Sequence, residues 1–104
     1  MLLLKAEALN EASASNVGAA ASALNQVRNR AGLANTAAGT QSAMRDAIRK
    51  ERRRELGFEF HRFFDVMRYG KEYAVAALGT GAWSAERYYF PIPQSEKDAN
   101  AALK

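Results

Sequence analysis

The chain has 104 residues and a net charge of +4, with 48% apolar and 25% charged residues. Because 22 of the apolar residues are alanine, the larger side chains can build only one modest core. This composition excludes a disordered tail or a collagen-like chain, and no apolar run approaches the roughly 20 residues of a membrane-spanning helix. The lack of cysteine excludes disulfides and thiolate chemistry. We expect a single domain or a fragment of one over residues 1–104.

Abundant alanine, two prolines and few β-branched residues predict helix along most of the chain. Apolar residues at helical spacing predict a first helix over residues 1–12 and a second over residues 19–31, with a turn at residues 10–18 between them. Gly32 should end the second helix. Because the connection is short, the two helices should pack as an antiparallel pair.

A third, strongly charged helix should follow a small-residue loop at residues 34–40, begin at Thr40 or Ser42, and continue to Gly70. Gly57 lies inside this run, where it either interrupts the helix or allows a neighbouring chain to come close. The apolar stripe of this helix consists of Met44, Ile48, Leu56, Phe60, Phe63, Phe64 and Met67.

The C-terminal part should contain less helix. We expect a short helix followed by a glycine-rich turn over residues 71–81. Residues 87–93 should be extended because a residue before proline is displaced from the helical region. Ser95 should open a last short helix, with Asp98 in the capping-box position. The predicted fold is all-α: an antiparallel helix pair packs on a long charged helix, with an extended C-terminal arm.

Charged side chains recur at helical spacing in the third helix. Opposite charges three or four residues apart on a helix can pair, which predicts a structural charge network that fixes this helix against neighbouring chain. The network consists of Arg52, Glu55, Glu59 and Arg62 on one face, continued by Asp65 and Arg68.

Four stretches, in this order, carry a family resemblance: residues 4–11 (LKAEALNE), 24–33 (LNQVRNRAGL), 51–70 (ERRRELGFEFHRFFDVMRYG) and 90–96 (FPIPQSE). They resemble the AEALNE, LNxVRxRAGL, ERRxELxFEGxRxxDLxRxG and LxPIPxxE segments of the SusD/RagB family of surface glycan-binding lipoproteins in Bacteroidota. The family pattern has glycine where this chain has Phe60. The chain resembles only the C-terminal portion of a full member, so we expect a fragment, an excised domain or a truncated product.

The resemblance implies a fold, a function and a location. The helices would be arranged like tetratricopeptide repeats, on a scaffold that docks against a TonB-dependent outer-membrane transporter. The full protein would capture oligosaccharide or another nutrient at the cell surface and pass it to the transporter. This region would be a scaffold, non-enzymatic and without a cofactor, although the chain itself carries no visible signal peptide or lipobox.

Other chemistry receives less support from the sequence. His61 and Asp65 are four residues apart and near Glu59, but a metal site needs a third ligand at suitable spacing, and we expect none. Glu55 and Glu59 are a possible acid–base pair, but both have arginines at pairing distance along the helix. We therefore expect no catalytic residues.

The alternative function is a basic helical module for nucleic acid or another protein. Arg45, Arg49, Arg52 and Arg53 occupy adjoining helix faces and could meet phosphates. Interleaved acidic residues argue against nucleic acid, and we expect none as a partner.

Trp83, Tyr88 and Tyr89 are the candidate ligand-binding residues, because sugar rings stack on flat aromatic faces. The competing interpretation is that this segment packs on the helices. Leu2, Leu3 and Leu4 begin the chain without a helix cap, and large apolar residues are few, which predicts an exposed apolar patch and self-association of the isolated chain.

Overall fold

The computed structural model describes residues 1–79, 89–100 and 102, and in this part the chain forms six α-helices and no strand. The prediction of an all-α fold is therefore confirmed. The chain divides into two compact units, Met1–Phe60 and His61–Lys104. Whether residues 1–104 make one domain stays a prediction.

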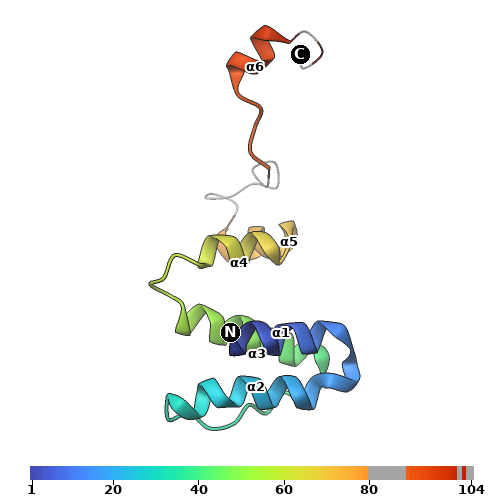
Figure 1. Cartoon of the computed structure of the whole chain (residues 1–104), viewed down its shortest axis with the longest axis vertical. Helices are drawn as coiled ribbons and strands as arrows, with labels where there is room; N and C mark the ends of the chain where they lie inside the picture. The colour runs from blue at the N-terminus through green and yellow to red at the C-terminus, as the bar shows by residue number, and fades with distance from the viewer. Residues whose placement is uncertain (80–88, 101, 103–104) are drawn as a thin grey trace. The chain divides into compact units, whose positions relative to one another are not determined.

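Helices α1 (Leu2–Ala12) and α2 (Val17–Arg30) form the predicted antiparallel pair (Figure 1). The connection is tighter than the predicted turn. Ser13 is extended, its hydroxyl accepts a hydrogen bond from the Ser15 amide at 3.2 Å, and a 3-10 turn, η1 (Ala14–Asn16), leads directly into α2. The first helix ends at Ala12 as predicted, whereas the turn that Ser13 caps lets α2 begin at Val17, two residues earlier than predicted.

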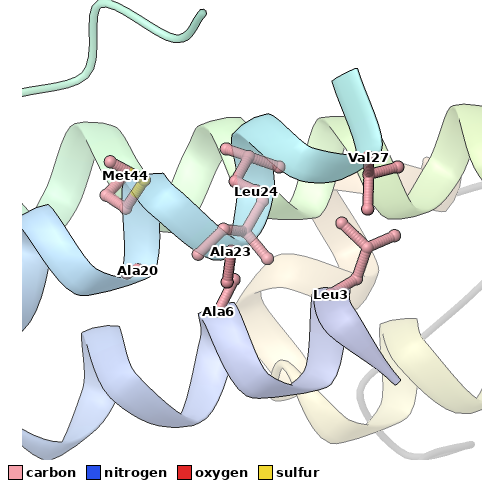
Figure 2. Close-up of a cluster of buried hydrophobic side chains, with 8 residues drawn as sticks. Leu3, Ala6, Ala20, Ala23, Leu24, Val27 and Met44 are labelled. Carbon is pink, nitrogen blue, oxygen red and sulfur yellow. The ribbon is translucent and has the colours of Figure 1, made fainter. Parts of the chain in front are cut away.

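The core of the first unit lies between three helices, α1, α2 and α3 (Gln41–Glu55). Figure 2 shows side chains from these helices gathered in the space between them. Three of its members are alanines, whose small size lets helix backbones approach closely, while Leu24 is fully buried. The buried members are Leu3 and Ala6 of α1, Ala20, Ala23, Leu24 and Val27 of α2, and Met44 and Ile48 of α3.

Gly32 ends α2 as predicted, and its φ of +73° explains the choice of residue. The Leu33 amide donates to the Arg28 carbonyl at 2.9 Å and the Gly32 amide donates to the Asn29 carbonyl at 3.0 Å. This pair of bonds is a Schellman motif, which needs a left-handed residue at the position that Gly32 occupies.

Helix α3 begins after Thr40, whose hydroxyl accepts a hydrogen bond from the Ala43 amide at 3.2 Å, so Thr40 is the cap of the two candidates. The predicted continuation to Gly70 is wrong. Helix α3 ends at Glu55, residues 56–61 form a connection, and α4 (Arg62–Arg68) follows. Of the two alternatives for Gly57, the interruption is the observed one. A Cβ there would lie 3.1 Å from the Arg53 carbonyl oxygen.

The predicted apolar stripe is divided by this interruption. Met44 and Ile48 are buried in the core of the first unit. Phe60, Phe63 and Phe64, by contrast, are exposed. The spacing that would place all of them on one face holds only along a continuous helix, and the chain leaves the helical path at residue 56.

In the second unit, α4 and α5 (Lys71–Leu78) pack together, with Val66 and Ala74 fully buried. Gly70 ends α4 as predicted, with a φ of +100°. Tyr69 and Tyr73 stack edge to face with ring centroids 5.1 Å apart. Of the predicted turn at residues 79–81, the structure describes Gly79, which follows α5 with a φ of +78°, and the other two residues lie outside the described part of the chain.

The C-terminal arm is described from residue 89 onward. Residues 89–93 have no helix, and Pro93 has an extended backbone (φ −55°, ψ 144°) that leads into α6 (Gln94–Ala99). The helix thus begins one residue before Ser95, and the predicted capping box is not formed. Asp98 instead accepts a hydrogen bond from the Gln94 side chain at 2.8 Å. The tetratricopeptide-like arrangement stays a prediction.

Candidate functional site

Arg28 is the centre of a polar contact between α2 and α3. Its Nη1 donates to Glu51 Oε2 at 2.7 Å, and its Nε donates to the Ala34 carbonyl at 2.9 Å. Only 5% of the Glu51 side chain is exposed, so the carboxylate lies out of water and depends on this guanidinium. One arginine therefore fixes both the neighbouring helix and the start of the loop at residues 33–40.

The same loop is held at a second point. Asn25 Oδ1 accepts a hydrogen bond from the Thr36 amide at 2.8 Å, and the Ala38 amide donates to the Thr36 hydroxyl at 3.3 Å. Further along α2, Arg30 pairs with Glu55 at the end of α3, in a more exposed position. The loop that connects α2 and α3 is thus bound along α2.

A second polar contact joins the end of α1 to the start of α3. Asn10 Nδ2 donates to the Gln41 carbonyl at 3.0 Å, and Gln41 Nε2 donates back to the Asn10 carbonyl at 2.6 Å. Asn10 is fully buried, and these bonds satisfy its Nδ2 and its backbone carbonyl, whereas its Oδ1 accepts no hydrogen bond from the described residues.

Beside it, Arg45 binds Glu11 in a bidentate pair, with both N–O distances at 2.7 Å. The hydrogen bond from Arg45 lowers the pKa of Glu11, and the carboxylate raises the pKa of Arg45 in return. The pair is partly exposed, with 34% and 43% of the two side chains accessible to water.

These polar contacts coincide with three of the four motifs. Asn10 and Glu11 belong to the first motif, Asn25, Arg28 and Arg30 to the second, and Glu51 and Glu55 to the third. The sequence did not predict these contacts between helices, because helical spacing reveals only partners that lie along the same helix. The available signal was the position of these polar residues inside the motifs.

The structure distributes the predicted charge network over separate elements. Arg52 and Glu55 lie in α3, Glu59 lies in the connection, and α4 carries Arg62, Asp65 and Arg68. The single helical face that would join the first four is not formed, because α3 ends at Glu55. Asp65 and Arg68 form an ion pair at 3.0 Å.

Of the three candidate ligand-binding aromatics, the structure describes Tyr89 alone, and Trp83 and Tyr88 lie outside the described residues. Tyr89 is 69% exposed, and Lys71 Nζ lies 5.0 Å from its ring centroid. A cation at this distance is attracted to the ring face. The aromatic platform stays a prediction.

Among residues 1–79, 89–100 and 102, no three His, Cys, Asp or Glu side chains lie close enough to hold a metal ion. His61 is exposed before α4, and Asp65 is buried beside Arg68. Glu55 pairs with Arg30 and not with a second carboxylate.

Most arginines of the basic face that could meet phosphates are paired or at least partly buried within the first unit. Arg45 binds Glu11, Arg52 is buried, and Arg49 is half-buried. Arg53 alone of the four is exposed. A phosphate backbone would need several arginines on one accessible face.

A comparison with protein families matches residues 1–81 to the SusD family (SusD/RagB). The chain belongs to this family. Membership suggests a role in binding glycans or other nutrients, and the family's members are binding proteins and not enzymes. It also suggests a cell-surface lipoprotein of the outer membrane. No curated protein and no solved structure matches the chain.

A search of the described helices finds none with the length and apolar character needed to cross a membrane.

Proposed function

We propose that this chain is the scaffold region of a cell-surface glycan- or nutrient-binding protein that works with a TonB-dependent transporter in polysaccharide uptake. Family membership over residues 1–81 supports the class of protein. The observation that carries the scaffold role is the use of the motif side chains between helices of the same unit.

A side chain that is hydrogen-bonded to a neighbouring helix is not available to bind a ligand. Glu51 is enclosed with Arg28, and the Asn10 amide is buried against Gln41. Buried polar groups with their partners in place fix an arrangement of helices, and displacing either partner would leave the other unsatisfied. The motifs therefore fit a part that holds shape while ligand contacts lie elsewhere in a larger protein.

The transporter partnership is tested in a bacterium that encodes the chain. A tagged copy is cross-linked in intact cells, purified from the outer-membrane fraction, and its partners are identified by mass spectrometry. We expect a TonB-dependent transporter among them. The control is an unrelated outer-membrane lipoprotein with the same tag. Recovery of the tagged protein with no transporter above this control would contradict the partnership.

The scaffold role is tested by calorimetry of the 104-residue chain with a panel of oligosaccharides. We expect no binding by the chain alone. A matched variant, Tyr89→Ala, tests the aromatic candidates, because stacking on an aromatic ring contributes directly to sugar affinity. Binding by the parent that is lost in Tyr89→Ala would assign the ligand site to this segment and contradict the scaffold role.

A further inference from the structure

We draw no further inference here: the strongest candidate, the apolar hollow on α1 lined by Met1, Leu2, Leu4, Lys5 and Ala8, lies at the start of the sequence, and nothing in the structure shows what covers it.

Discussion

Phe60 has a backbone φ of 59°, in the left-handed region that favours glycine. The SusD/RagB pattern that this segment resembles has glycine at the same position. This conformation costs a residue with a Cβ roughly 1–2 kcal/mol, and glycine adopts it without a comparable cost. The turn after α3 therefore keeps its geometry here at the expense of local backbone strain, in a position where the exposed side chain gains little from packing.

We predict that Phe60→Gly stabilises the chain. Relief of the left-handed conformation exceeds the extra entropy that glycine gives the unfolded chain, so the free energy of unfolding should rise by roughly 0.5–1 kcal/mol. Urea unfolding followed by circular dichroism measures the change. Phe60→Ala is the control, since it removes the ring and keeps the strain. An equal gain in both variants would show that the ring, and not the backbone, was responsible.

Glu51 and Glu55 offer a matched pair of ion-pair deletions. Glu51→Ala leaves the Arg28 guanidinium without its carboxylate in a largely enclosed position, which should cost about 3 kcal/mol. Glu55→Ala removes the partner of Arg30, whose side chain is mostly exposed, and should cost under about 1 kcal/mol. Thermal melting of both variants beside the parent compares them. Equal melting temperatures in the two variants would contradict a structural role for the enclosed pair.

At the scale of elements, the sequence predicts the positions of the first two helices and the Gly32 and Gly70 stops, and it narrows the cap of the third helix to Thr40 or Ser42, because these features depend on local chemistry. The sequence does not predict contacts that depend on which helices pack against each other. Glu55 has an arginine three residues before it in α3, yet it pairs with Arg30 of α2. Periodicity finds partners along one helix, whereas partners on another helix require knowledge of how the helices pack.

The Glu11–Arg45 pair joins α1 to α3 and should make their packing sensitive to acid. The Arg45 hydrogen bond lowers the pKa of Glu11 below its ordinary value of 4.5, so the folded state binds this proton less readily than the unfolded chain. The contribution is fully present above the unfolded pKa and is lost as the pH falls through the lowered, folded pKa. Because the pair is partly exposed, it amounts to under about 1 kcal/mol.

To test this, the free energy of unfolding of the parent is compared with that of Glu11→Gln at a series of pH values. We expect a constant difference in unfolding free energy above about pH 5 that shrinks as the pH falls below 4.5. Repeating the series in 1 M salt is the control, since screening weakens an exposed pair. A difference that stays constant down to the acid unfolding transition would contradict the linkage.

At the scale of the whole molecule, each compact unit contains buried residues of its own. Leu24 is fully buried between α1, α2 and α3, and Val66 is fully buried in the unit that contains α4 and α5. The interruption at residues 56–61 falls at the boundary between the units. The glycine inside the third predicted helix was therefore the sequence signal of this boundary.

Hydrogen exchange of two core variants tests this division. Leu24→Ala deletes buried methyl groups and should destabilise the first unit by about 2–5 kcal/mol, because the cavity it leaves is only partly closed. Amides of α1, α2 and α3 should then exchange faster together, since those helices share one core. Val66→Ala should accelerate exchange in α4 and α5 by a smaller factor, as valine loses fewer methyl groups. If either substitution accelerated all five helices equally, the two units would be unfolding as one, and the boundary at Phe60 would have no energetic meaning.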